Sequence, residues 1–278
     1  MFCHIHSKNL KTLFQIVLII SLFCLLFSCS PSDQTSRPEI KIHYLGHSSF
    51  VIQFDNGISI LTDYGKFNAW AQWGWDSPIN DIGDFVPQVV TYSHTHHEDH
   101  YDVDRIPKGV KHKLIDLDSL SIYGIKITPI RTNENSLDST DNTSFLFTYK
   151  KMNILHLGDC QANILNIQDE TNRNRLKKIF PETFDLVLMP IEGKSKFIPE
   201  AEEFMHLLQP KRVIPMHYWS NQYKEDFLKY LDEQNITIGK SYEIQKLNSA
   251  QVSISDTKIK SSSIQIISLE PGSFKKNN

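Results

Sequence analysis

Cysteine is scarce in this chain of 278 residues, which contains four. Cys3, Cys24 and Cys29 all fall within the first thirty residues, so Cys160 is alone in the remainder. If the N-terminal stretch is removed, no intramolecular disulfide can form. The stability of the remaining domain must then come from its hydrophobic core and from any ion that it binds.

Extended runs of basic residues are also missing. The chain has 29 Lys and Arg against 32 Asp and Glu, for a formal net charge of -3. Binding to nucleic acid phosphates calls for a positive surface, so the composition argues against a nucleic-acid partner. With 40% hydrophobic and 22% charged residues, the chain can bury a full core as one globular domain.

Long apolar runs are absent except near the N-terminus, where 13–27 is almost wholly apolar. This run is short for a membrane span, which needs roughly twenty residues. Lys8 and Lys11 precede it and Ser28-Cys29 follow it, which is the pattern of an export signal. The alternatives are a cleaved signal without lipid and an uncleaved anchor.

The residues around Cys29 resemble the lipobox of bacterial lipoproteins, which implies a lipid-anchored protein of the bacterial cell envelope that faces the periplasm or the outside. We therefore predict a signal peptide over 1–28, a Ser- and Pro-rich tether over 29–39 and one domain over 40–278. Cys29 would carry the membrane anchor.

Short apolar or alternating runs between turn residues predict strands along the whole domain. These runs cover 40–45, 50–54, 58–63, 86–93, 113–115, 125–130, 144–149, 153–157, 185–189, 212–215 and 264–269. Helices are predicted from Pro199 and over 222–233, with a return to strands from Ile236. Strands first, then alternating strands and helices, suit an α/β fold of two facing sheets with helices outside.

The densest chemical signal is the segment 93–102, Ser-His-Thr-His-His-Glu-Asp-His-Tyr-Asp, which we call the histidine loop. Histidine is a common zinc ligand and carboxylates balance the charge of a bound cation. The loop directly follows a predicted buried strand, which would hold its side chains rigidly. Two further strands end in ligand-type residues, at His156 with Asp159 and at His217.

These features in this order resemble the metallo-β-lactamase superfamily, and most closely its branch of L-ascorbate 6-phosphate lactonase and related metal-dependent hydrolases. The segments that carry the resemblance are 45–50, 60–63, the histidine loop, 154–159 and 214–218. The resemblance implies a four-layer αββα sandwich with one or two metal ions at the sheet rim. Carried over by position, the implied metal ligands are His94, His96, Asp99, His100, Asp159 and His217.

Supporting roles are implied for Asp63, beneath the histidine loop, and for His156. His43, His47, His112 and His206 are expected to be structural or exposed, with His47 the nearest of them to the site. Tyr218 is expected to be a core aromatic.

The histidine loop departs from the family pattern by one extra residue, because His97 and Glu98 both separate His96 from Asp99. Either the loop bulges by one residue, or the register shifts so that His97 is a ligand and Thr95 takes the place of the first histidine. The shifted register loses a ligand, so the bulge is preferred.

A second departure is the missing histidine in 131–135, where Glu134 stands about where the family carries one. Glutamate can ligate zinc, manganese or iron, so Glu134 is a candidate ligand. The alternative is that Glu134 is a surface residue and that one metal position is weak or empty.

The resemblance implies hydrolysis by a metal-activated hydroxide, with Asp99 and Asp159 holding the metals and steering the nucleophile. The expected substrate is a small ester, lactone or phosphodiester, and the expected cofactor is one or two Zn²⁺ ions, with Mn²⁺ or Fe²⁺ as alternatives. The runner-up is a metal- or ligand-binding lipoprotein of the same fold with a degraded hydrolytic site. Three of the four tryptophans fall within 64–85, either as a packed flap or as a lid facing the substrate.

Overall fold

The computed structural model describes residues 39–74, 76, 78–115, 118–133, 141–160, 169–180, 183–191, 197–237, 241–255 and 263–275. The predicted signal segment, Cys29 and Glu134 lie outside these residues. Within the described ranges, no helix is long and apolar enough to cross a membrane.

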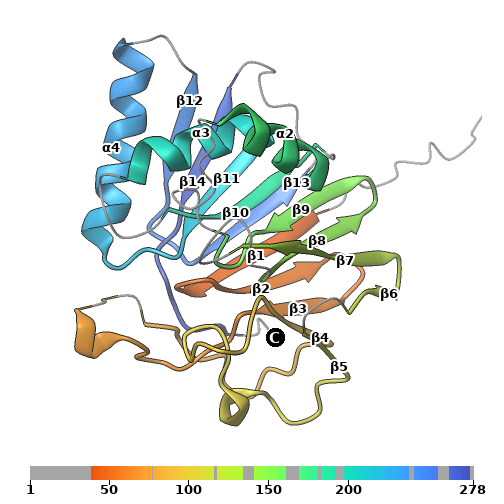
Figure 1. The fold of residues 1–278 in the computed structure, drawn as a ribbon. Helices are drawn as coiled ribbons and strands as arrows, with labels where there is room; N and C mark the ends of the chain where they lie inside the picture. The colour runs from red at the N-terminus through yellow and green to blue at the C-terminus, as the bar shows by residue number, and fades with distance from the viewer. Residues whose placement is uncertain are drawn as a thin grey trace, which may run out of the picture. The chain divides into compact units, whose positions relative to one another are not determined.

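The first sheet is built from the N-terminal half of the domain and one later strand, in the order β13-β1-β2-β3-β4-β5 (Figure 1). Its strands are β1 (Glu39–Gly46), β2 (Ser49–Phe54), β3 (Ser59–Thr62), β4 (Val89–Tyr92), β5 (His112–Ile115) and β13 (Gln251–Ser255). β1, β2 and β3 form an antiparallel meander, whereas β3, β4 and β5 run parallel. Gly57, with φ 84°, makes the turn between β2 and β3 that the Asp-Asn-Gly sequence predicts.

The second sheet has the strand order β12-β14-β11-β10-β9-β8-β7-β6. Its strands are β6 (Leu120–Ile122), β7 (Ile125–Thr132), β8 (Asn142–Tyr149), β9 (Met152–His156), β10 (Leu186–Pro190), β11 (Arg212–Met216), β12 (Tyr242–Lys246) and β14 (Ile264–Ser268). β9, β10 and β11 are parallel neighbours. All residues of β10 and β11 are buried, as expected for parallel strands covered on both faces.

Helices cover the outer face of the eight-stranded sheet (Figure 1). They are α2 (Glu170–Ile179), α3 (Ile198–Leu208) and α4 (Asn221–Thr237). α3 carries Pro in its first turn and buries Phe204, Met205 and Leu208, so its apolar stripe faces the core. One continuous core joins these helices with the inner faces of the two sheets.

The outer face of the six-stranded sheet is covered differently in the part of the chain that is described. Loops carrying two short 3₁₀ helices, η1 (Ala71–Trp73) and η2 (Val103–Arg105), lie there in place of α-helices. Tyr64, Ile79 and Ile82 from these loops pack on Leu61 and Val90 in a second cluster. The predicted α/β architecture of two packed sheets is confirmed, with loops forming one of the outer layers.

Three local predictions differ from the structure. The sequence pattern carries no clear signal for α2, because the helix is polar apart from Leu176 and Ile179. It also gave none for β6, which is three residues long. The return to strands was predicted from Ile236, but α4 continues to Thr237 and the next strand begins at Tyr242.

Candidate metal centre

The ligand-type residues come together because several strands end at one rim of the two sheets. Asp63 directly follows β3, the histidine loop follows β4, and His217 directly follows β11. Asp159 lies three residues beyond β9. Since β3 and β4 are parallel, and β9, β10 and β11 are parallel, their carboxyl ends share an edge in each sheet.

One group of four buried residues could hold a cation: His47, Asp99, His100 and His217, whose ligand atoms all lie within 4.8 Å of one another. His47 Nε2 is 2.9 Å from Asp99 Oδ2. His217 Nε2 is 3.1 Å from His100 Nε2. Two imidazole nitrogens that face each other at this distance are well placed to share a cation.

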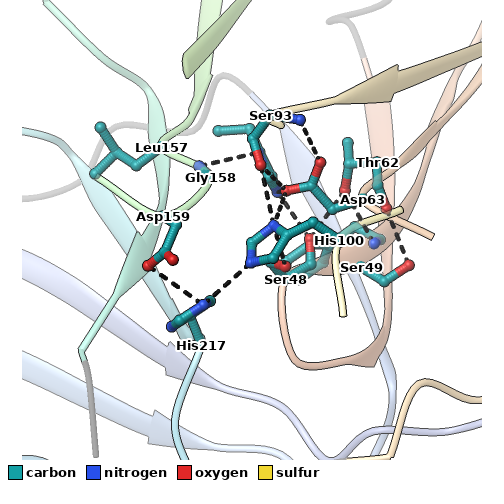
Figure 2. A network of polar contacts seen from close by, with 12 residues as sticks. Ser48, Ser49, Thr62, Asp63, Ser93, His100, Leu157, Gly158, Asp159 and His217 are labelled. Atoms are coloured by element: carbon teal, nitrogen blue, oxygen red, sulfur yellow. Dashed lines mark hydrogen bonds and ion pairs between the residues drawn. The ribbon is translucent and has the colours of Figure 1, made fainter. Parts of the chain in front are cut away.

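A second group consists of His94, His100 and Asp159 and shares His100 with the first. The Asp159 carboxylate faces both groups: its Oδ1 is 3.3 Å from His217 Nε2, and its Oδ2 is 3.9 Å from His94 Nε2. Figure 2 shows Asp159, His217 and His100 facing one another across the site. A carboxylate placed in this way could bridge two cations.

Asp63 lies behind His100 and orients it (Figure 2). It accepts hydrogen bonds from Ser93 N at 2.7 Å, from Ser93 Oγ at 2.8 Å and from His100 Nδ1 at 2.9 Å. With Nδ1 held by Asp63, the Nε2 of His100 is the nitrogen available to a metal. Burial raises the pKa of the Asp63 carboxyl, and the nearby His156 and the Ser93 hydrogen bonds offset this only in part.

The backbone at the site is strained. His47 has φ 52°, Asp63 φ 39° and His217 φ 52°, all in the left-handed region that non-glycine residues rarely adopt. Such residues cost on the order of 1–3 kcal/mol each and persist where the surrounding structure fixes them. Here His47 O accepts from both His217 N at 2.9 Å and Tyr44 Oη at 3.0 Å.

Gly158 and Asn142 position Asp159. Asp159 N donates to Asn142 Oδ1 at 2.9 Å, and Asn142 Nδ2 donates to Leu157 O at 2.9 Å. Gly158 has φ 62°, and a Cβ atom there would lie 2.4 Å from Ser93 Cβ. This position therefore needs glycine both for its conformation and for the close approach of the histidine loop.

The protonation states suit a cation site. Burial lowers the pKa of His94 and of His100, which keeps both imidazoles in the neutral form that binds metals. Burial alone raises the pKa of Asp99, but His100 and His47 outweigh it and hold that pKa well below 3.8. Asp99 Oδ1 is buried and has no hydrogen-bond partner among the described residues. Neutral histidines, an ionised carboxylate and this unsatisfied oxygen fit a bound metal ion.

The structure brings together His94, Asp99, His100, Asp159 and His217 of the predicted ligands. His96 is exposed and belongs to neither group, although its ring centroid is 4.3 Å from that of His94. Glu134 lies outside the described residues, so its predicted role stays a prediction.

Two features bear on the register of the histidine loop and on the supporting residues. His97 is partly buried and Thr95 exposed, and neither is in a group. His156 is buried and donates through Nε2 to Ser48 O at 2.8 Å, and Tyr218 is buried in the core. His156 therefore lies where a supporting residue was expected, and Tyr218 lies where a core aromatic was expected.

His47 is the member of the two groups that the sequence does not single out as a candidate ligand. It was expected to be structural or exposed and to lie near the site, yet it belongs to the first group. The available signal was the Gly46-His47-Ser48-Ser49 turn at the end of the first strand. Gly46 has φ 125° and a Cβ there would lie 2.0 Å from Pro78 O, so this turn is tightly enclosed.

Comparison with known proteins identifies the family. Residues 41–217 match the model of the β-lactamase superfamily domain. The chain belongs to this family. Among its relatives, a UPF0173 metal-dependent hydrolase of Methanosarcina barkeri is 25% identical over 210 residues, which are 64% of this chain and 83% of that protein. A UPF0173 metal-dependent hydrolase of Methanobrevibacter smithii is 26% identical over 211 residues, covering 64% and 82%.

Solved structures agree on the fold. A Thermotoga maritima protein assigned to the Zn-dependent hydrolases of the metallo-β-lactamase superfamily superposes with a TM-score of 0.52 at 22% identity, covering 83% of this chain and all of that one. The family match and the named relatives confirm the predicted superfamily and hydrolase class, and the solved structure confirms the predicted fold. The lactonase branch, the substrate and the metal stay predictions.

Proposed function

We propose that this hydrolase binds two cations, one at each of the two residue groups, and cleaves a small ester, lactone or phosphodiester. The orientation of Asp159 carries the proposal. One of its oxygens faces His217 and the other faces His94, at 3.3 and 3.9 Å. A carboxylate that only supported the fold would have no reason to divide its two oxygens between histidines of two different groups.

Cations bound in these groups would lower the pKa of a water molecule and polarise the group under attack. The residues of the chain supply the rest. The Asp159 carboxylate lies between the histidines of the two groups. Asp63 holds the His100 ring through its Nδ1. The buried Oδ1 of Asp99 can accept a hydrogen from the attacking water and so orient it for attack.

Zinc is the proposed metal, with manganese or iron as alternatives. Three or more imidazoles with two carboxylates form a donor set that zinc accepts readily. Carboxylates shift the preference toward harder ions, so the identity of the metal depends on how many of them coordinate.

The test uses the full chain purified in detergent, stripped with a chelator and reloaded with zinc. Asp159→Asn should lower kcat/KM on the best ester or lactone by more than about a hundredfold. Asp185→Asn is the matched control, because Asp185 is also buried but lies at the opposite end of β10, where it pairs with Lys211. Less than about half an equivalent of any transition metal in the wild type would overturn the proposal.

A second candidate is a metal- or ligand-binding protein whose hydrolytic site is degraded. The exposure of His96, outside both groups, favours it. Glu134→His separates the two functions. A strong gain of metal and of activity would indicate a degraded site, and a loss of both would indicate that Glu134 is a ligand.

We further propose that Cys29 carries a lipid and that the domain faces the periplasm or the outside of a bacterial cell. The basic, apolar and Ser-Cys order of the first thirty residues supports this location. Metabolic labelling with a fatty acid should mark the wild type and not Cys29→Ala. Equal labelling of both would refute lipid attachment at this residue.

A further inference from the structure

The segment between β3 and β4 carries an aromatic loop, which we define as residues 66–74 and 76. Both of its ends are attached to segments of the metal centre. Lys66 N donates to Glu98 O in the histidine loop at 2.6 Å, and Lys66 Nζ is 3.0 Å from Glu98 Oε2. At the other end, Asp76 N donates to Trp219 O at 2.7 Å, two residues after His217. The aromatic loop therefore runs beside the histidine loop and the turn after β11.

Trp70 packs against the histidine loop. Its ring centroid is 5.6 Å from that of His97, in an edge-to-face arrangement of 66°. His97 in turn is 5.5 Å from the ring centroid of His94, a member of the second group. One imidazole therefore separates the indole of Trp70 from a proposed metal ligand.

The backbone of Trp70 is strained in the same way as that of the site residues. Among the described non-glycine residues, eight have positive φ: His47, Asp63, Trp70, Tyr123, Lys150, Lys151, Gln209 and His217. Gln209 caps the C-terminus of α3. Tyr123, Lys150 and Lys151 lie in turns between neighbouring strands, where such angles are common. Trp70, at φ 62°, is the N-cap residue of η1, a position whose backbone is normally extended, and it shares with His47, Asp63 and His217 a strained backbone beside the metal centre. A bulky residue in this conformation is unusual and points to a function.

We propose that Trp70 is a specificity-determining residue, which contacts an aryl or alkyl group of the substrate while the scissile bond lies at His94 and Asp159. The substrate class that this favours is an ester or lactone with an uncharged apolar group about one ring length from the reacting carbon. An indole offers such a group a large apolar surface and a favourable ring-to-ring geometry. This inference rests on the proposed hydrolysis.

The kinetic test compares ethyl phenylacetate with ethyl acetate on the zinc-loaded full chain. Trp70→Ala should lower kcat/KM for the phenyl ester on the order of tenfold, mainly through KM, and leave ethyl acetate within about twofold. Trp70→Phe should restore most of the loss. Trp73→Ala is the matched control, because Trp73 is in the same loop but is 69% exposed. Equal losses on both esters, or equal effects of the Trp70 and Trp73 variants, would overturn the inference.

A binding measurement separates failure of this inference from failure of the proposed function. Calorimetric titration with phenylacetate and with acetate needs zinc in the protein but no turnover. The wild type and Trp73→Ala should prefer phenylacetate by about tenfold, and Trp70→Ala should lose this preference at unchanged zinc content. A preference that survives in Trp70→Ala overturns the role of Trp70. Absence of hydrolysis in a zinc-loaded wild type that keeps the preference overturns the proposed function and supports the role of Trp70 in recognition.

Discussion

Asp63→Asn tests how the protein positions His100, the histidine shared by the two groups. Asp63 is 1% exposed and accepts three hydrogen bonds, two from Ser93 and one from His100 Nδ1, at 2.7, 2.8 and 2.9 Å. The amide of asparagine has one oxygen to accept with, and its NH₂ group would face a donor. At least one buried donor then loses its partner.

Two magnitudes follow for Asp63→Asn. A buried donor without a partner costs about 1–3 kcal/mol, which should appear as a lower free energy of unfolding of the metal-free protein. Loss of the group that orients a metal-binding histidine lowers metal affinity by about 10–100-fold, which corresponds to about 1.4–2.7 kcal/mol. The loss in affinity should exceed the error of a competition titration.

The assay is competition for zinc between the protein and a chelating dye, combined with urea unfolding of the metal-free form. Asp55→Asn is the control, because Asp55 lies at the opposite end of β2, where it pairs with Lys150. Its zinc affinity should match that of the wild type. Zinc affinity of Asp63→Asn within about twofold of the wild type would refute the role of Asp63 in orienting His100.

Three further predictions concern packing, metal and pH. Gly158→Ala should be less stable than Gly57→Ala by about 1–3 kcal/mol in urea unfolding. Both glycines have positive φ, but a Cβ atom at Gly158 would lie 2.4 Å from Ser93 Cβ, whereas one at Gly57 would meet nothing within 4 Å. Equal losses would contradict the close packing at Gly158. Zinc at a hundred times its Kd should stabilise the protein by about 2.7 kcal/mol for each of the two proposed sites, and a chelator should reverse this, as measured by thermal unfolding, whereas no shift would argue against a folded-state site. Burial lowers the pKa of His43 in the folded state below 6.5. Below pH 6.5 the unfolded state therefore binds more protons at this residue than the folded state does. The stability that neutral His43 contributes above pH 6.5 is then lost as the pH falls toward the folded-state pKa. Below pH 6.5 the free energy of unfolding should therefore fall less steeply with pH in His43→Asn than in the wild type. The two slopes should differ by up to about 1.4 kcal/mol per pH unit. Equal slopes would contradict the lowered pKa of His43.

The parts of the fold that follow from local patterns were predictable. The alternating run of β1, the Asp-Asn-Gly turn before β3 and the apolar strand β4 are each recognisable within a few residues of sequence. Ligand-type residues after β4 and β11 predicted a shared rim, because strand ends in parallel sheets meet at one edge. The polar helix α2 lacked such a pattern and was missed.

The role of His47 could not be read from the sequence, because it depends on contacts between distant segments. His47 O accepts from His217 N, and its Nε2 lies beside Asp99. The Gly46-His47-Ser48-Ser49 turn indicates that His47 lies near the site, but its spacing does not reveal these partners. Likewise, His94 is buried and His96 is exposed although one residue separates them, and this difference required the structure.

Two cations with Asp159 between them are proposed for this chain. Crystals of the zinc-loaded protein, measured at the zinc absorption edge, test this proposal most directly. Two anomalous peaks are expected, one beside His47 and His217 and one beside His94, with the two Asp159 oxygens facing different peaks. A single peak at full zinc loading, or peaks away from Asp159, would contradict the proposal.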